Sequence, residues 1–370
     1  MLSANSNCKT NQLETADNTP AAMSSLQEHY PWASQPLIAN AAMGGFAGPA
    51  LALAVSLAGG IGFIGAVKDM VKLDQQLISA KSLLGNDKLK VADPSTLPMG
   101  VGFLLFAASI DDATAVIGRH KLAIVWFACP TQEGDFENWS KAVRKASPAS
   151  RIWIQVGSVS VARRVASTCS PDVLILQGSD AGGHGPFPGA GIVSLVPEIR
   201  DTLDREGFSE IGIFAAGGIG DGRGVAAALS CGADGVVMGT RFLASEEVEL
   251  PAEEYRKTIL ETKDGGVTTS RATVFDELAG KSIWPSEYDG RAVAGASYQD
   301  FNNGVGIEEV RSKYASAVKE SHKGFGGEVR AAIWAGTGIG LVTEVKTAGE
   351  IVKECRDSAR LCLEKAIKRL

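Results

Sequence analysis

The sequence predicts an α/β protein: a (β/α)8 barrel followed by a smaller, mostly helical C-terminal cap segment. Eight short apolar runs recur between residues 36 and 239, each ending in a small residue and followed by a stretch with helical spacing. Apolarity within the runs is continuous rather than alternating, as it is in strands buried on both faces of a parallel sheet. Eight repeats favour a closed barrel. A doubly wound open sheet is the alternative, because periodicity does not reveal closure.

The expected strands are 36–40, 61–65, 100–104, 123–127, 152–156, 173–177, 211–216 and 235–239. Helices are expected between them, for example at 158–167, with Ser158 as N-cap, and at 221–230, before the helix-ending Gly232. The uncharged stretch 31–67 is long enough for a transmembrane helix. Two prolines and seven glycines divide it instead into strand, helix (49–58) and strand, so we reject a membrane span.

The chain divides into four predicted segments. Residues 1–34 are polar at their start and are expected to be a disordered tail, and residues 35–245 form the barrel. Residues 246–345 form a helical and irregular cap over the active site, with no periodic strand pattern, and 346–370 form an amphipathic helix that packs on the barrel. Asp276 and Glu277, within the cap, could line the pocket, but a solvated helix face is the expectation.

Composition limits the functional classes. A 370-residue chain with 45% hydrophobic residues and a formal charge of -6 is typical of a globular protein and argues against nucleic-acid or membrane partners. Six dispersed cysteines give no metal-ligand or disulfide spacing, which indicates reduced thiols in a cytoplasmic protein without a metal. The ending Lys368-Arg369-Leu370 only loosely resembles a peroxisomal signal. A homodimer is left open.

Two neighbouring loops predict a phosphate site. The seventh strand ends in glycines that include Gly217 and Gly218, and the eighth ends in Met238-Gly239-Thr240. Glycines allow backbone N–H groups to approach phosphate oxygens, and barrels place such sites after strands seven and eight. Glycines that only serve tight β-to-α turns are the alternative. Neither this region nor GTGIG at 336–340 completes a dinucleotide motif, so a mononucleotide or sugar phosphate is favoured.

The segment QGSDAGGHGP at 177–186 contains one of only four histidines. His184 follows the buried run 173–176, and catalytic residues of barrels lie at the C-terminal ends of strands. An imidazole there suits proton abstraction near neutral pH. A histidine that merely completes a turn is the alternative.

Three motifs carry a family resemblance. LQGSDAGGHGP at 176–186 resembles the Q-G-x-E-A-G-G-H signature of the nitronate monooxygenases, formerly called 2-nitropropane dioxygenases. The segments 215–247, with AAGGIGDGRG and GVVMGTRF, and 273–293, with TVFDELAGKSIWPSEYDGRAV, are similar to the family's later motifs in the same order. Differences include Asp180 for the usual glutamate and Gln155 where bacterial relatives carry a lysine.

The resemblance implies a TIM barrel with bound FMN and oxidative denitrification of alkyl nitronates, or of nitroalkanes, by O2 to a carbonyl compound and nitrite. It implies His184 as catalytic base or anion stabiliser. The implied FMN-binding residues are Met43, Gln177, Gly182, Gly217, Gly218, Val237, Met238, Gly239 and Thr240. Alternatives are an NAD(P)H-dependent FMN reductase of the enoyl-thioester reductase type, a flavin-free phosphate-binding barrel, and a non-catalytic binding protein.

Overall fold

A computed structural model describes residues 21–66, 68–85, 89–91, 93, 95–320 and 322–370, with the side chains of 21–24 excepted. Its centre is one sheet of eight parallel strands, in the order β1-β9-β8-β6-β5-β4-β3-β2. The strands are β1 (Leu37–Asn40), β2 (Phe63–Gly65), β3 (Leu97–Leu104), β4 (Leu122–Ala128), β5 (Arg151–Val156), β6 (Val173–Gln177), β8 (Gly212–Ala216) and β9 (Gly235–Met238). The predicted (β/α)8 barrel is therefore confirmed.

The barrel closes between β1 and β2. Isolated parallel bridges pair Ala39 with Ile61 and Gly44 with Gly65, so that the sheet returns on itself. The interior is filled by large side chains from successive strands, including Phe63, Trp126 and Trp153, which pack edge to face or tilted. These rings make the barrel interior a packed core rather than an open channel.

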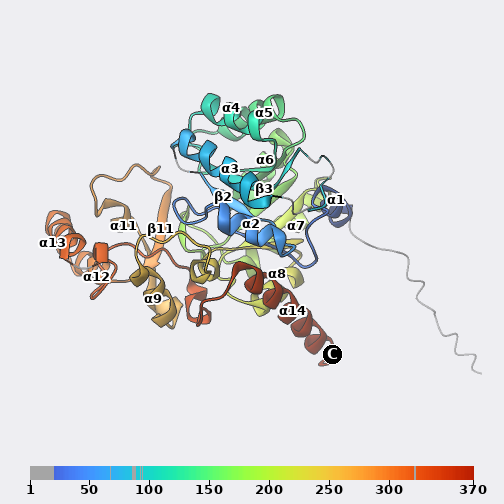
Figure 1. The fold of residues 1–370 in the computed structure, drawn as a ribbon. Helices are drawn as coiled ribbons and strands as arrows, with labels where there is room; N and C mark the ends of the chain where they lie inside the picture. The colour runs from blue at the N-terminus through green and yellow to red at the C-terminus, as the bar shows by residue number, and fades with distance from the viewer. Residues whose placement is uncertain (1–20, 67, 86–88, 92, 94, 321) are drawn as a thin grey trace, which may run out of the picture.

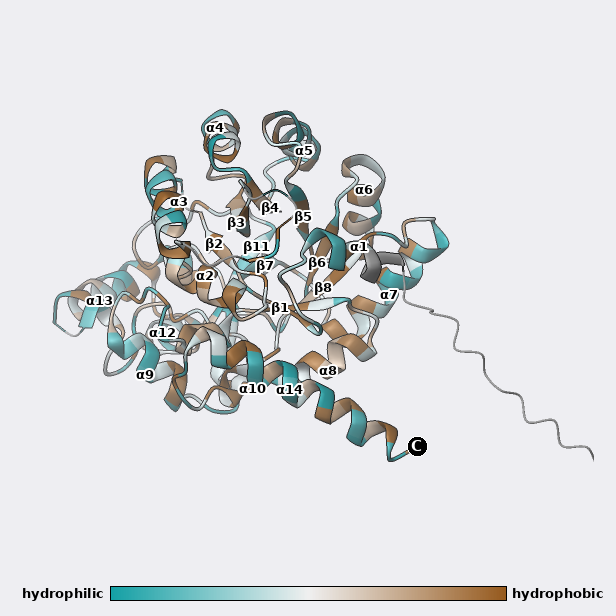
Figure 2. Cartoon of the chain, turned by 45° about the vertical axis from the view of Figure 1, so that its right-hand side comes forward, coloured by the Kyte–Doolittle hydropathy of each residue, from teal (hydrophilic) through white to brown (hydrophobic). Residues whose placement is uncertain are grey.

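Helices surround the barrel with their apolar faces turned inward (Figure 2). They are α2 (Pro49–Leu57), α3 (Met70–Leu84), α4 (Ile110–His120), α5 (Asp135–Ala146), α6 (Val159–Cys169), α7 (Ile192–Arg205) and α8 (Gly222–Ser230). Helix α6 is capped by Ser158 as predicted, and Asp221 caps α8. Among the described residues, no helix combines the length and apolarity needed to cross a bilayer.

The cap stands to one side of the barrel (Figure 1). Its helices are α9 (Glu253–Glu261), α10 (Gly265–Thr268), α11 (Val274–Glu277), α12 (Ala296–Asn302) and α13 (Ile307–Glu320), with short 3-10 turns η2 (His322–Gly324) and η3 (Thr337–Leu341). A further 3-10 turn, η1 (Thr240–Ala244), follows β9 within the barrel segment. The expectation of no strand pattern was wrong here. Strands β10 (Thr269–Ala272) and β11 (Tyr288–Val293) pair antiparallel with β7 (Gly183–Pro186) from the loop after β6.

The two ends of the chain also pack on the barrel. Residues 1–20 of the predicted tail lie outside the described part, but α1 (Ala21–His29) is a helix, and Leu26 and Tyr30 are buried beneath the barrel. The Tyr30 hydroxyl accepts a 2.6 Å hydrogen bond from the Trp153 indole, which explains why this part of the expected tail is ordered. The C-terminal helix α14 (Ala348–Ile367) packs against α8 and α2 (Figure 1).

Candidate active site

A cavity of about 360 Å³ opens at the C-terminal ends of the strands and is covered by the cap. The cavity is lined by nine of the ten residues that the sequence analysis singled out: Met43, Gln177, Gly182, His184, Gly217, Gly218, Val237, Gly239 and Thr240. The tenth, Met238, does not line it. Its side chain is 1% exposed and packs in the apolar layer outside the barrel, because alternate residues of β9 face opposite sides of the sheet.

The glycine loop after β8 has a backbone that only glycine adopts readily. Gly217 and Gly218 have φ angles of 114° and 73°, in the region that side chains disfavour. The Thr240 hydroxyl does not point freely into the cavity, since it accepts a 3.0 Å hydrogen bond from the Gly336 N–H. The two predicted loops do meet at one edge of the cavity, as a shared phosphate site requires.

A third glycine segment, missed as part of the site by the sequence analysis, lies over these loops. Gly336 and Gly338 line the cavity, and a Cβ on Gly338 would come within 2.6 Å of the Gly218 carbonyl oxygen. Thr337 fastens this segment to the loop after β6, because its N–H and hydroxyl donate to the backbone oxygen and the carboxylate of Asp180, at 3.0 and 3.1 Å. GTGIG is therefore a lining segment brought in from the cap.

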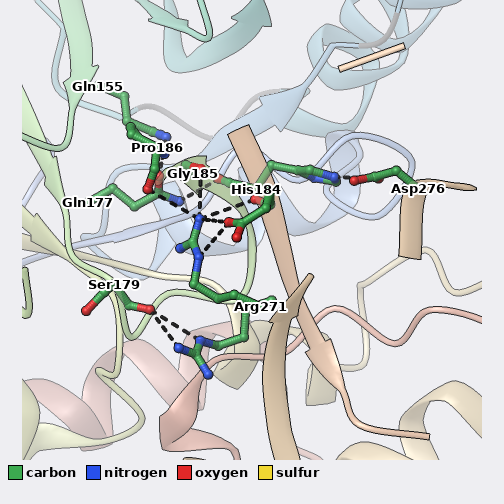
Figure 3. Close-up of polar contacts among 10 residues, drawn as sticks. Gln155, Gln177, Ser179, His184, Gly185, Pro186, Arg271 and Asp276 are labelled. Atoms are coloured by element: carbon green, nitrogen blue, oxygen red, sulfur yellow. Dashed lines mark hydrogen bonds and ion pairs between the residues drawn. The ribbon is translucent and has the colours of Figure 1, made fainter. Parts of the chain in front are cut away.

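His184 lies on strand β7, where it pairs with Gly290 of β11. Its Nε2 is 2.7 Å from Oδ1 of Asp276, which belongs to α11 in the cap (Figure 3). The two side chains are only 12% and 7% exposed. The expectation that Asp276 sits on a solvated helix face was therefore wrong, because the cap folds α11 back onto the strand that carries the histidine.

Two tryptophans enclose the imidazole. The ring of Trp284 stacks on His184 with a centroid distance of 3.5 Å and an interplanar angle of 8°. Trp334 lies on another side, at 4.6 Å and 51°. Tyr255 supports Trp334, since its hydroxyl accepts a 2.7 Å hydrogen bond from the Trp334 N–H, and burial raises the pKa of Tyr255 above its usual range. Both tryptophans line the cavity, so an aromatic wall faces any ligand beside His184.

Amide side chains of two barrel strands position the backbone of His184 (Figure 3). Gln155 of β5 donates to Oε1 of Gln177 at 2.8 Å, and Nε2 of Gln177 donates to the His184 carbonyl oxygen at 2.9 Å. A Cβ at Gly185 would lie 2.6 Å from Gln177 Oε1, so a side chain at 185 would push this amide aside. Gln155 is thus part of a hydrogen-bond chain linking three strands.

A buried arginine holds β7 in place from the cap. Arg271 of β10 forms an ion pair with Asp289 of β11 and donates to the Gly185 carbonyl oxygen at 2.7 Å (Figure 3). Arg291 donates to the carbonyl oxygen of Ser179 at 3.2 Å, and burial, followed by the nearby charge of Arg271, lowers its pKa. Both guanidinium groups therefore form polar contacts with other groups of the protein.

No cluster of three or more histidine, cysteine or acidic side chains that could hold a metal ion occurs among the described residues. The described cavity lining contains no Asp, Glu, Lys or Arg, and its titratable side chains are His184, Cys129 and Tyr255. It also contains Trp126, whose buried indole nitrogen has no hydrogen-bond partner in the described part of the chain. An unpaired buried N–H is costly, so this nitrogen is a local energetic penalty inside the barrel.

Fold and cavity together define a protein of the (β/α)8 barrel class, with a cavity at the C-terminal ends of the strands. Comparison with known proteins identifies the family: the family model for nitronate monooxygenase matches residues 105–357. A nitronate monooxygenase of Metarhizium robertsii is 39% identical over 93% of this chain and 97% of its own length. One of Neurospora crassa is 39% identical over 94% and 96%. The chain therefore belongs to the nitronate monooxygenase family of oxidoreductases.

Solved structures support the fold. FabK from Thermotoga maritima superposes with a TM-score of 0.70 and 24% identity, covering 95% of this chain and 99% of that one. A nitroalkane oxidase from Streptomyces ansochromogenes gives a TM-score of 0.69 and 22% identity, covering 92% and 99%. At these identities the likeness establishes the shared barrel fold alone.

Proposed function

We propose that this protein oxidises alkyl nitronates, and nitroalkanes after deprotonation, with O2 to a carbonyl compound and nitrite, and that it uses FMN. The observation that carries the proposal is one cavity in which a glycine-lined edge and His184 face the same space. Family membership supports the reaction type.

The residues present fit FMN. Three glycine segments converge where a phosphate would bind: Gly217–Gly218, Gly239 and Gly336–Gly338. Nitronate monooxygenases are generally flavin-dependent, which agrees with this chemistry.

We assign the phosphate to backbone N–H groups of Gly217, Gly218, Gly239 and Thr240, and the ring to the neighbourhood of Met43, Gln177, Gly182 and Val237. Met238 is left out of this set, because it does not line the cavity. Bound FMN would supply the electron-accepting ring that the protein's side chains lack. The protein's own part is to bind, orient and desolvate the substrate.

His184 is the basic side chain among the described lining residues, so we assign it the contact with the nitro or nitronate group. A neutral imidazole takes a proton from the carbon next to a nitro group, and a charged one stabilises the nitronate anion. The tryptophans beside it favour a substrate with a small alkyl group over a highly charged one.

The test is an absorbance spectrum of the purified protein, repeated after anaerobic addition of propyl-2-nitronate. Flavin bands near ~370 and ~450 nm that bleach, with acetone and nitrite formed when air is readmitted, are expected. Flavin bands that are unchanged by nitronate but bleached by NADPH would identify a reductase instead. A colourless protein that FMN does not reconstitute would overturn the cofactor assignment.

A further inference from the structure

We propose that Asp276 is a positioning residue that fixes the tautomer of His184, so that Nδ1 is the atom that accepts the substrate proton. The identity of the substrate in this inference rests on the proposed function, whereas the contact between His184 and Asp276 does not depend on it. It assigns a part of the proton-transfer site to the cap, whereas the histidine itself comes from the barrel loop.

The ion pair is built across the two parts of the chain. His184 and Asp276 are separated by 92 positions, and their 2.7 Å contact joins β7 to α11. The carboxylate side chain is 7% exposed, so little water competes for the contact. A carboxylate accepts hydrogen bonds, and therefore the imidazole nitrogen that faces it must carry a proton. That nitrogen is Nε2.

The imidazole cannot easily turn to exchange its nitrogens. Trp284 covers one face at 3.5 Å, nearly parallel to it, and Trp334 lies at 4.6 Å. Gly290, opposite on β11, leaves just enough room: a Cβ there would lie 3.2 Å from His184 Nε2 and 2.4 Å from the Trp334 ring. The packing therefore holds the ring in the orientation that the carboxylate selects.

With Nε2–H donated to Asp276, the lone pair of neutral His184 is on Nδ1. Nδ1 has no hydrogen-bond partner among the described residues. It is also not one of the fully buried polar atoms that lack a partner, and the His184 side chain lines the cavity. The second nitrogen is thus the one left for a ligand.

The proton step balances without a further reagent. The bond between the nitroalkane α-carbon and its hydrogen breaks, the electron pair stays on the substrate as nitronate, and the proton moves to Nδ1. The imidazolium so formed keeps its Nε2–H on the Asp276 carboxylate, and a buried opposite charge stabilises it. A substrate supplied as nitronate needs no such step.

The first test reads the tautomer directly. Long-range ¹H–¹⁵N spectra of ¹⁵N-histidine-labelled protein at pH 8 contain only four imidazoles, and His184→Gln identifies the one in question. We expect a protonated Nε2 and an unprotonated Nδ1 for His184. A proton on Nδ1, alone or with Nε2, would overturn the proposal, and this measurement requires no substituted carboxylate to fold.

Variants then test the cause. Asp276→Ala is expected to give a mixture of both tautomers, whereas Asp276→Asn, whose amide oxygen still accepts, is expected to restore Nε2–H. Glu277→Gln is the matched control, because this neighbouring carboxylate turns toward Arg311, at 3.9 Å, and is 35% exposed. An unchanged His184 spectrum in Asp276→Ala would show that packing alone sets the tautomer.

Kinetics separate this inference from the proposed function. Turnover of nitroethane relative to ethylnitronate is expected to fall about a hundredfold in Asp276→Ala and to stay unchanged in Glu277→Gln, because only the neutral substrate needs a base. An equal loss on both substrates would contradict a role in proton transfer. If the wild-type protein oxidised neither, the proposed function would fail, and the spectra would still decide the tautomer.

Discussion

Cys129 shows how burial determines the chemistry of a single residue. It follows β4 with a φ of 54°, lines the cavity and is 3% exposed. Burial raises the pKa of its thiol to about 12. Only about one thiol in ten thousand is then ionised at pH 8, and the thiolate is the nucleophilic form. Despite its place in the cavity, Cys129 is therefore a packing residue rather than a nucleophile.

Alkylation with iodoacetamide at pH 8 checks this. In native protein, Cys231, which is half-buried at the end of α8, is expected to react within the time in which Cys129 stays unmodified. Peptide mass spectrometry identifies the modified sites, and unfolded protein, in which both react, is the control. Equal rates for Cys129 and Cys231 in native protein would show that the Cys129 thiol is more ionised or more accessible than its surroundings indicate.

Single residues of the site differ in how far the sequence could identify them. His184 was identifiable because a rare residue type follows a buried strand, and Gly217 and Gly218 because a glycine-rich loop follows the seventh expected strand. Asp276 was not, because its local sequence is that of an ordinary helix face. Its partner is 92 positions away, and only the folding of the cap brings the two together.

At the scale of elements, the small sheet β10-β11-β7 holds His184 in place. Strand β7 reads GHGP, with two glycines and a proline and little intrinsic strand propensity. It becomes a strand because β11 supplies hydrogen bonds and Arg271 binds its carbonyl oxygen at Gly185. The barrel strands were predictable from their own apolar runs. This sheet depends on partners distant in the chain, so no local pattern indicated it.

Replacing Arg271 with methionine is expected to lower the free energy of unfolding by about 3 kcal/mol, because it leaves the Asp289 carboxylate buried at 11% exposure without its partner. Urea unfolding measures the change. Arg223→Met is the matched control, since that arginine is 69% exposed in its pair with Asp221, and no measurable change is expected. Similar losses in the two variants would mean that the Arg271 pair contributes no more than a surface contact.

At the scale of the whole molecule, the barrel is completed by segments far from it in sequence. The cap returns GTGIG to the glycine loops, and α14 then crosses the outside of the barrel onto α8. The amphipathic pattern of 346–370 predicted that this helix packs on the barrel, but not which helices it contacts. Its position depends on close backbone contact at Gly222, where α8 begins directly after the loop that carries Gly217 and Gly218.

Gly222→Ala tests this docking. A Cβ at 222 would lie 2.6 Å from the carbonyl oxygen of Cys355 and from the amide nitrogen of Ala359, both backbone atoms of α14, which cannot rotate away. Alanine in a helix otherwise stabilises relative to glycine by about 0.5–1 kcal/mol, so the docking reverses the expected sign. We expect a loss of about 1–3 kcal/mol in the free energy of unfolding, seen as a melting temperature lower by a few degrees.

The control is Gly306→Ala, where a Cβ meets nothing within 4 Å, and it should leave the melting temperature unchanged or slightly higher. If Gly222→Ala melted at or above the wild-type temperature, α14 would have to be able to shift away from α8 at little cost.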